Sequence, residues 1–327
     1  MQLVFILNKL IFIIIKLLEI ILKLFENIYM NLKIKYKDQE FFAVISDVDI
    51  KSISTSEFIQ IKQAVETYGV VVIESQIIDD DDQIKFSEGF GKLEISIGTQ
   101  TKSPVYNIEN GIRPEISRIS NVDLNNNKLP ANDDKVIFDR GNNVFHTDSS
   151  FKAIPSKISI LSAREVPEEG GGTHFVDARH ALETWHDKPR KYSIQDLREC
   201  ICEHSIVYSR MINTGDIFDD KFKQDMPFVK QKLIRIHPYT KKPAFYAGSH
   251  CSNILGWDLK EARSLIKEIN EWIVESGSMA KHKWKTGELV LWDNRRVLHR
   301  GTGYDEANYR RIMHRTTVAG DMPSYKE

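Results

Sequence analysis

Residues 142–151 read Asn-Asn-Val-Phe-His-Thr-Asp-Ser-Ser-Phe, which places the imidazole of His146 two positions before the carboxylate of Asp148. In extended backbone the side chains of residues i and i+2 point to the same face, so these two groups can reach one common point. They form two thirds of the 2-His-1-carboxylate set that holds non-haem Fe(II). The same tripeptide also occurs in surface turns, where the carboxylate accepts backbone hydrogen bonds. A metal site therefore requires a second histidine.

A candidate for that histidine lies near the other end of the chain. Residues 287–299 read Gly-Glu-Leu-Val-Leu-Trp-Asp-Asn-Arg-Arg-Val-Leu-His, in which an alternating strand ends at an Asp-Asn turn. His299 follows on the next short segment. Strands far apart in sequence can be neighbours in a jelly-roll barrel, so the wide separation of His299 from His146 and Asp148 is no objection to a shared site.

The chain after Phe151 is predicted to be mainly β. Helices are expected over Asp177–Trp185 and over Asp258–Glu275, where apolar residues recur at helical spacing. About eight short strands over roughly 170 residues, with the helices placed outside them, are typical of a jelly-roll barrel and not of a parallel sheet. The expected strands are Lys157–Ala163, Thr173–Asp177, Glu203–Ser209, Leu233–His237, Ala244–Ala247, Leu289–Trp292 and Arg311–Val318.

The segment before residue 142 is predicted to buttress this barrel. A helix starting at the caps Ser54-Thr55-Ser56 and ending at Gly69 lies between two strands, Phe41–Val48 and Val70–Glu74. Asp79–Asp82 are typical first-turn acids of a second helix. Gly98–Gly141 is rich in Asn, Asp, Pro and Gly and holds only short strand-like pieces such as Ile116–Val122, which predicts an irregular lid or binding loop.

Composition indicates a globular protein without a general affinity for polyanions. The 327 residues are 41% hydrophobic and carry a formal net charge of -1, so we expect no nucleic-acid partner. Any anion must therefore bind through local charges. The three cysteines, Cys200, Cys202 and Cys251, are too few for a disulfide framework. This favours a reducing compartment, and we expect a cytoplasmic protein.

Residues 1–29 form an apolar extension that differs from the rest of the chain. Leu and Ile dominate Leu3–Leu24, and the charged residues recur on one stripe of a helix. The apolar runs are too short for a membrane span, which needs roughly 20 residues. We expect an amphipathic helix that contacts a membrane surface or a partner. A wrongly assigned start, with translation from Met30, is the alternative, and residues 30–327 are then the single domain.

Two arginines near the C-terminus indicate an anion site. Arg311 and Arg315 are four apart in a segment rich in β-branched residues, so on a strand both face the same way, with Met313 between them. Buried guanidinium groups require anions, and their planar fork suits a carboxylate or sulfonate. Gly170-Gly171-Gly172-Thr173 adds a hydroxyl at the start of a strand. Salt-bridged arginines on an edge strand are the alternative.

In combination these motifs resemble the taurine and 2,4-dichlorophenoxyacetate dioxygenase family of Fe(II)/2-oxoglutarate enzymes, over roughly residues 35–320. The resemblance implies a double-stranded β-helix barrel and an iron held by His146, Asp148 and His299. Thr173 and Arg311 would bind the remote carboxylate of 2-oxoglutarate. Arg315 matches a position that binds either 2-oxoglutarate or the acidic group of the substrate.

The implied activity uses Fe(II), 2-oxoglutarate and O2 to hydroxylate a C–H bond of a small organic anion, releasing succinate and CO2. A sulfonate, an aryloxyalkanoate or a similar carboxylate would suit. Asn142 and His237 match positions that can face substrate, and relatives often form homo-oligomers. The chain departs from the family pattern at Phe145, often Trp, and at Gln231-Lys232, often His-Pro. A catalytically silent jelly-roll binding protein and a zinc hydrolase are the alternative functions.

Overall fold

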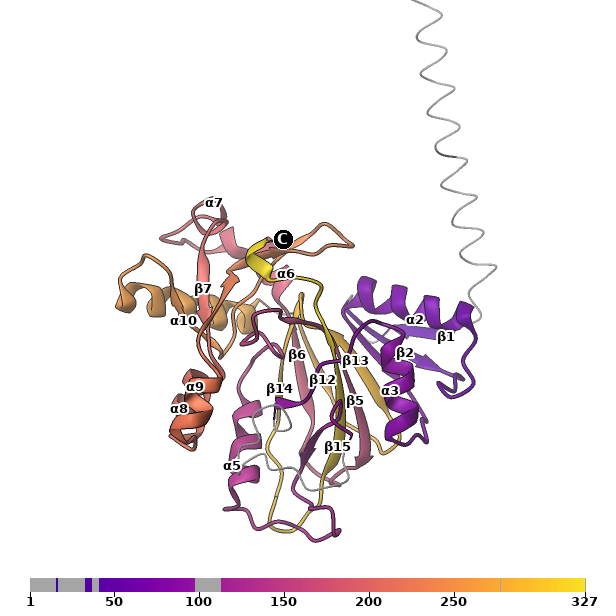
Figure 1. The fold of residues 1–327 in the computed structure, drawn as a ribbon. Coiled ribbons are helices and arrows are strands. Elements are labelled where there is room, and N and C mark those ends of the chain that lie inside the picture. The colour runs from indigo at the N-terminus through magenta and orange to yellow at the C-terminus, as the bar shows by residue number, and fades with distance from the viewer. Residues whose placement is uncertain (1–15, 17–32, 37–40, 98–112, 277, 327) are drawn as a thin grey trace, which may run out of the picture.

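The computed structural model describes residue 16 and residues 33–36, 41–97, 113–276 and 278–326. Within these ranges the chain is mainly β with flanking helices (Figure 1). The expected N-terminal extension lies outside the described residues, apart from Lys16. Among the helices that are described, none is both long enough and apolar enough to span a membrane.

The largest sheet has seven strands in the order β1-β2-β3-β13-β5-β15-β4. Its neighbouring strands are antiparallel except β2 and β3, which run parallel. β3 is a run of β-branched residues that is buried throughout, as expected of an inner strand. The strands are β1 (Lys33–Tyr36), β2 (Phe42–Ser46), β3 (Val70–Ile73), β4 (Ser117–Ser120), β5 (Ser156–Glu165), β13 (Leu289–Asp293) and β15 (Ile312–Ala319).

A three-stranded sheet, in the order β12-β6-β14, packs against the inner face of the large sheet. Its strands are β6 (Thr173–Asp177), β12 (Met279–His282) and β14 (Val297–Gly301). Phe175 of β6 and Trp292 of β13 meet in the interior with ring centroids 5.7 Å apart, and Met313 joins the same core. The β13–β14 turn carries the chain from one sheet to the other.

Alternation along β13 explains why helices cover the other face of the large sheet. Val290 and Trp292 point into the core between the sheets, whereas Leu289 and Leu291 join a second core beneath α2 (Thr55–Tyr68) and α3 (Asp80–Glu88). Both helices begin with a capping box, at Ser54 and Asp79. In Figure 1 these helices lie on one side of the central strands, with α5, α8 and α10 on the other.

Smaller sheets and helices complete the described fold. The amphipathic α10 (Leu259–Glu275) packs against β11 and α6, burying Leu265 and Ile269. The remaining strands pair as β11-β7-β8 and β10-β9. Their bounds, with those of the other helices, are β7 (Ile201–His204), β8 (Val229–Lys232), β9 (Ile234–Ile236), β10 (Pro243–Phe245), β11 (Cys251–Ile254), α5 (Asp134–Arg140), α6 (Ala178–Glu183), α7 (Ile194–Leu197), α8 (Ile206–Thr214) and α9 (Asp220–Asp225), with 3-10 turns at Gly141–Asn143, Trp185–Asp187 and Ser324–Lys326.

One expectation about local structure was wrong. The strand expected over Glu203–Ser209 ends at His204, because Ser205 caps a helix by accepting a hydrogen bond from the Tyr208 N–H. The described part of Gly98–Gly141 contains β4, within the expected strand-like piece Ile116–Val122, and also the helix α5, which was missed and which Asp133 caps. β8, β11 and β12 were also missed. Among the described residues, backbone pairing forms separate sheets and not one closed barrel.

Candidate metal centre and adjoining cavities

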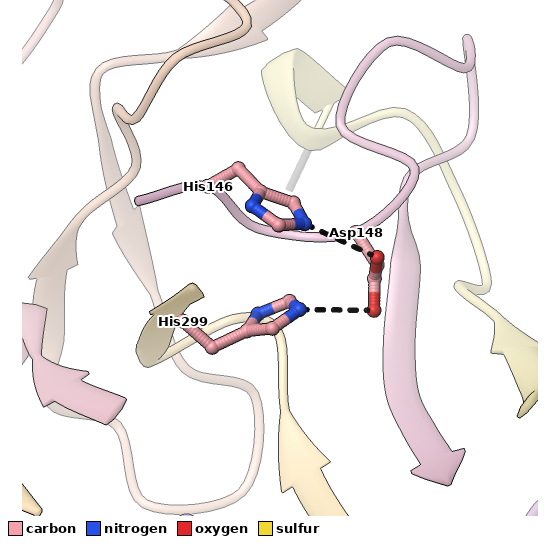
Figure 2. A group of neighbouring side chains, drawn as sticks. All are labelled: His146, Asp148 and His299. Carbon is pink, nitrogen blue, oxygen red and sulfur yellow. Dashed lines mark ion pairs between the residues drawn. The ribbon is translucent and has the colours of Figure 1, made fainter. Parts of the chain in front are cut away.

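His146, Asp148 and His299 converge on one point in the core of the molecule (Figure 2). His146 and His299 form an antiparallel bridge in which each backbone N–H donates to the carbonyl of the other, at 3.0 and 2.8 Å. Asp148 lies two residues further along the same segment. Its carboxylate oxygens lie 3.8 Å from His146 Nε2 and 3.7 Å from His299 Nε2. All three side chains are buried.

Each imidazole is held with Nε2 toward the carboxylate. His146 Nδ1 lies 2.8 Å from the Val144 carbonyl, and a proton donated there leaves the Nε2 lone pair facing Asp148. The His299 ring is held by packing, with the Trp292 and Phe175 rings 4.6 and 6.2 Å away. Its Nδ1 has no hydrogen-bond partner within the described part of the chain.

Electrostatics favour the protonation states that metal binding requires. Burial raises the pKa of Asp148, but the charges of Arg315, His299 and His146 outweigh burial and lower it to about 2. Burial lowers the pKa of His146 to about 4 and that of His299 well below its usual range. At neutral pH the set therefore offers one anionic oxygen and two neutral nitrogens, which fits Fe(II) and leaves further coordination positions for other ligands.

One cavity beside this set contains Arg311 and is called the Arg311 cavity. His299, Thr173, Tyr304 and Asn142 also line it. Arg311 is buried, its Nε donates to the Gly171 carbonyl at 3.2 Å, and within the described ranges it forms no ion pair. Trp284 Nε1 donates to Thr173 Oγ at 2.9 Å, so the threonine retains its own proton for a ligand. These groups suit a carboxylate.

Glycines 170–172 are needed to bring the Gly171 carbonyl to Arg311. Gly170 and Gly171 have φ of +74° and +64°, which side chains rarely adopt. A Cβ on Gly171 would lie 2.8 Å from Pro167 and 3.3 Å from Arg311 Nε. The glycine run therefore has a steric function as well as leading into Thr173.

A second cavity contains Arg315 and is called the Arg315 cavity. His146 and Asp148 line it, and Arg315 Nη1 donates directly to Asp148 Oδ1. The wall is largely apolar and aromatic. Its other lining residues include Ile97, Ile119, Phe138, Phe151, Ile206, Arg210 and His250. The two cavities adjoin, since Ile119, Asp139 and Asn142 line both.

Asn142 and Phe145 occupy different surroundings. Asn142 lies where the cavities meet, and its Oδ1 accepts a hydrogen bond from Arg210 Nη2 at 2.7 Å. Phe145 points the opposite way from His146, into a groove beside α10 and beneath the Arg300 guanidinium. Successive residues of extended backbone face opposite sides, which places Phe145 away from the two arginine-lined cavities.

His237, which we expected to be able to face substrate, lines neither of these two cavities. It belongs to a buried network with Glu66, Asp293 and Arg295. His237 Nε2 lies 2.7 Å from Asp293 Oδ2 and 3.2 Å from Glu66 Oε2. Arg295 Nη2 lies 2.7 and 2.9 Å from the same two oxygens. Gln231, one of the positions at which the chain departs from the family pattern, also makes structural contacts. Its amide donates to the Ser150 and Lys152 carbonyls.

Arg210 and His250 are cavity residues that the sequence pattern did not identify. The region of Arg210 had been predicted as strand up to Ser209, which hid its position on α8. In a helix Ile206 and Arg210 are four apart and share a face, and both line the Arg315 cavity. A correct helix prediction would therefore have identified this arginine. His250 comes from the loop before β11, for which the sequence carries no comparable signal.

A buried site of two imidazoles and one carboxylate beside two arginine-lined cavities defines a metalloenzyme that acts on small anions. The sequence model of the "Taurine catabolism dioxygenase TauD, TfdA family" matches residues 35–317, and the chain belongs to this family.

The chain is 30% identical to the alpha-ketoglutarate-dependent 2,4-dichlorophenoxyacetate dioxygenase of Burkholderia sp. (strain RASC), covering 88% of this chain and 95% of that protein. It is 28% identical to the (S)-phenoxypropionate/alpha-ketoglutarate-dioxygenase of Sphingobium herbicidovorans, covering 88% and 94%. The crystal structure of AAD-2 in complex with Mn(II) and N-oxalylglycine superposes with a TM-score of 0.78 at 31% identity, covering 89% and 100%. The chain is an Fe(II)- and 2-oxoglutarate-dependent dioxygenase.

Proposed function

We propose that the enzyme hydroxylates a small carboxylic acid with an apolar body at iron held by His146, Asp148 and His299. The observation that carries this proposal is the position of the three side chains between two separate cation-lined cavities. His299 borders the Arg311 cavity, and His146 and Asp148 border the Arg315 cavity. Bound Fe(II) would couple O2 to the oxidative decarboxylation of 2-oxoglutarate to succinate and CO2 and to hydroxylation of the substrate.

In this proposal 2-oxoglutarate occupies the Arg311 cavity. Its remote carboxylate pairs with the buried Arg311 guanidinium and accepts the proton of the Thr173 hydroxyl. The backbone register supports this placement, because His299 pairs with Phe175 and Gly301 with Thr173 on adjacent strands. Thr173 and His299 are thus fixed on one small sheet, which orients the 2-oxo acid group toward the metal.

The substrate occupies the Arg315 cavity, and its acidic group pairs with Arg315. We assign Arg315 to the substrate and not to 2-oxoglutarate, because it lines the cavity of His146 and Asp148 and not the cavity of Arg311 and Thr173. Asn142 lies where the two cavities meet and accepts a hydrogen bond from Arg210. The guanidinium of Arg210 thereby adds positive charge to the wall of the Arg315 cavity.

The wall of the Arg315 cavity supports a substrate with an aromatic body. Phe138, Phe151 and Ile119 supply apolar surface beside the charged groups. An aryloxyalkanoate matches this arrangement, since its ring would pack on the apolar wall and its carboxylate would reach Arg315. A hydroxyl placed on the carbon next to the ether oxygen would lead to cleavage of that C–O bond.

Two measurements test the proposed function. Under anaerobic conditions, Fe(II) plus 2-oxoglutarate is expected to give a weak visible charge-transfer band, and His146→Ala or Asp148→Ala is expected to abolish it. In air, succinate release is expected to rise with aryloxyalkanoates more than with short alkyl sulfonates. A band that persists in both variants would overturn the ligand assignment. Succinate release that no organic acid stimulates would support the catalytically silent alternative.

The barrel architecture, the cellular location and the oligomeric state are further parts of the proposal. We infer a double-stranded β-helix in which the two packed sheets form the two walls of the barrel, within a single domain over residues 30–327. The three cysteines are free thiols, which supports a reducing, cytoplasmic location. Assembly into a homo-oligomer is part of the same proposal and is tested by light scattering of the purified chain.

A further inference from the structure

We propose that Asn294 is a positioning residue that fixes the metal ligand Asp148 at both its backbone and its carboxylate. The inference rests on the proposed role of Asp148 as a ligand. Asn294 lies in the Trp292-Asp293-Asn294-Arg295 turn, which passes from β13 to β14 and thus toward His299. Asn294 lines neither of the two cavities, so it acts through Asp148 and does not contact a reactant.

The first set of contacts holds the backbone of the ligand segment. Asn294 is 1% exposed, and its Oδ1 accepts hydrogen bonds from the Asp148 N–H and from Trp292 Nε1, each at 3.1 Å. Its main-chain carbonyl accepts the Thr147 hydroxyl at 2.8 Å. Two consecutive residues of the ligand segment are therefore bonded to a single residue of the turn.

The second set of contacts reaches the carboxylate through a serine. Asn294 Nδ2 donates to Ser159 Oγ at 2.9 Å, and Ser159 Oγ donates to Asp148 Oδ2 at 2.6 Å. A serine hydroxyl has one proton, so accepting from the amide directs that proton toward Asp148. Asp148 Oδ2 is thus held, through Ser159, by the same residue that accepts the Asp148 N–H.

This arrangement requires an amide at residue 294. An amide both accepts, from Asp148 and Trp292, and donates, to Ser159, whereas a carboxylate of the same shape can only accept. In Asn294→Asp the Ser159 proton would have a competing acceptor, and Asp148 would lose its fixed hydrogen bond. Residues that orient metal ligands in this way typically contribute about 10- to 100-fold to metal affinity.

The test measures Co(II) binding to the metal-free full-length protein. Asn294→Asp is expected to raise the Co(II) dissociation constant by about 10- to 100-fold and to change the visible Co(II) spectrum, which reports ligand geometry. Ser159→Ala is expected to act in the same direction and covers the case in which Asn294→Asp fails to fold. Because the two residues share one chain of bonds, the double variant should lose less than the product of the two single losses.

Gln83→Glu is the matched control. Gln83 is also a fully buried amide bonded to a serine of β5, since Ser162 Oγ donates to its Oε1 at 2.7 Å, but it lies in the contact between α3 and the large sheet. It should lower thermal stability without changing Co(II) affinity. Equal dissociation constants for wild type, Asn294→Asp and Ser159→Ala would overturn the inference, as would the same loss in Gln83→Glu. Wild-type protein that binds no Co(II) would instead overturn the proposed function.

Discussion

The molecule contains two buried clusters of histidine and carboxylate that look alike in composition and differ in chemistry. In the metal centre, His146, Asp148 and His299, and in the network of Glu66, His237 and Asp293, the candidate ligand atoms all lie within 4.8 Å of one another. In the metal centre, the imidazole nitrogens stand 3.7 and 3.8 Å from the carboxylate, too far for a hydrogen bond. This spacing suits three groups that bind one cation.

The network already contains its cation. Arg295 donates to both carboxylates, and His237 Nδ1 accepts from the backbone N–H groups of Tyr239 and Thr240, at 3.3 and 3.1 Å. The proton of His237 is therefore on Nε2, where it donates to Asp293 at 2.7 Å. Ligand composition alone does not distinguish a metal site from a salt-bridge network. The direction of the histidine lone pair does, together with the way the arginine is placed: Arg295 joins the carboxylates of Glu66 and Asp293, whereas Arg315 pairs with the single carboxylate of Asp148.

The largest expected effect is a difference in Co(II) affinity between variants of His146 and of His237. His146→Ala removes a proposed ligand, so turnover and Co(II) affinity should both fall by more than about a hundredfold, the upper range for residues that merely orient ligands. His237→Ala should lower stability while Co(II) affinity stays within about threefold of wild type. Titration of metal-free protein with Co(II) measures both. Equal losses of affinity in the two variants would mean that the network and the metal centre act as one site.

Removing the internal cation should convert the network into a metal site. Arg295→Leu leaves two buried carboxylates without their partner and should cost about 3–5 kcal/mol of unfolding free energy in metal-free protein. It should also free the space between Glu66, His237 and Asp293 for a divalent ion. Equilibrium dialysis is expected to find two bound Co(II) per chain in place of one, with stability partly restored by the metal. A single equivalent would show that the arginine is not what excludes a metal.

Part of this difference is visible in the sequence. His146 and Asp148 are two residues apart, so extended backbone alone predicts that they converge, and the strand pattern leading to His299 predicts a third group on a neighbouring strand. Arg311 and Arg315 follow from the same alternation, with Met313 buried between them. Most strands were predicted because their alternating or continuous apolar runs reflect the two cores on either side of the large sheet.

What could not be predicted depends on contacts between distant segments. Nothing near His237 shows that Glu66, about 170 residues away, supplies its partner, so it was expected to face substrate. Asn294 could be recognised as part of a turn, but its bonds to Asp148 and Ser159 join three separate segments. α8 was predicted as strand up to Ser209 because Ile206 and Val207 are β-branched, whereas the Ser205 cap determines the helix.

The arginines that face the cavities should differ from Arg295 in affecting the binding of the two reactants. Arg311→Ala is expected to raise the KM for 2-oxoglutarate by about 30-fold or more, since losing one partner of a buried charge pair costs about 2–5 kcal/mol. Arg315→Ala should instead raise the KM for the organic acid. Arg311→Lys should restore only part of the affinity, because an ammonium lacks the planar fork. Steady-state kinetics, with the concentration of each reactant varied separately, measures the two KM values. Identical changes in both KM values would contradict the assignment of one cavity to each reactant.

The smallest expected effect is on the free energy of unfolding at acid pH. Without metal, carboxylate variants of the two clusters should change its pH dependence in the same way, and with metal they should differ. Burial raises the pKa of Asp293, but the charge of Arg295 and the hydrogen bond from His237 outweigh burial and hold the pKa well below its usual range. A carboxyl with a lowered folded-state pKa stabilises the protein fully above its unfolded-state pKa of about 3.9, and this contribution is lost as pH falls below that value. Each such group adds at most about 1.4 kcal/mol per pH unit to the slope.

Urea unfolding of metal-free protein between neutral pH and about pH 3 measures these slopes. Asp293→Asn and Asp148→Asn should each lower stability at neutral pH and flatten the acid limb, because each removes one carboxyl with a lowered pKa. With saturating Co(II) at neutral pH the two variants should diverge, since the metal stabilises the folded state by binding it. Asp293→Asn should keep the full metal-dependent gain in unfolding free energy, and Asp148→Asn should lose it. An Asp293→Asn variant without that gain would place the network within the metal centre after all.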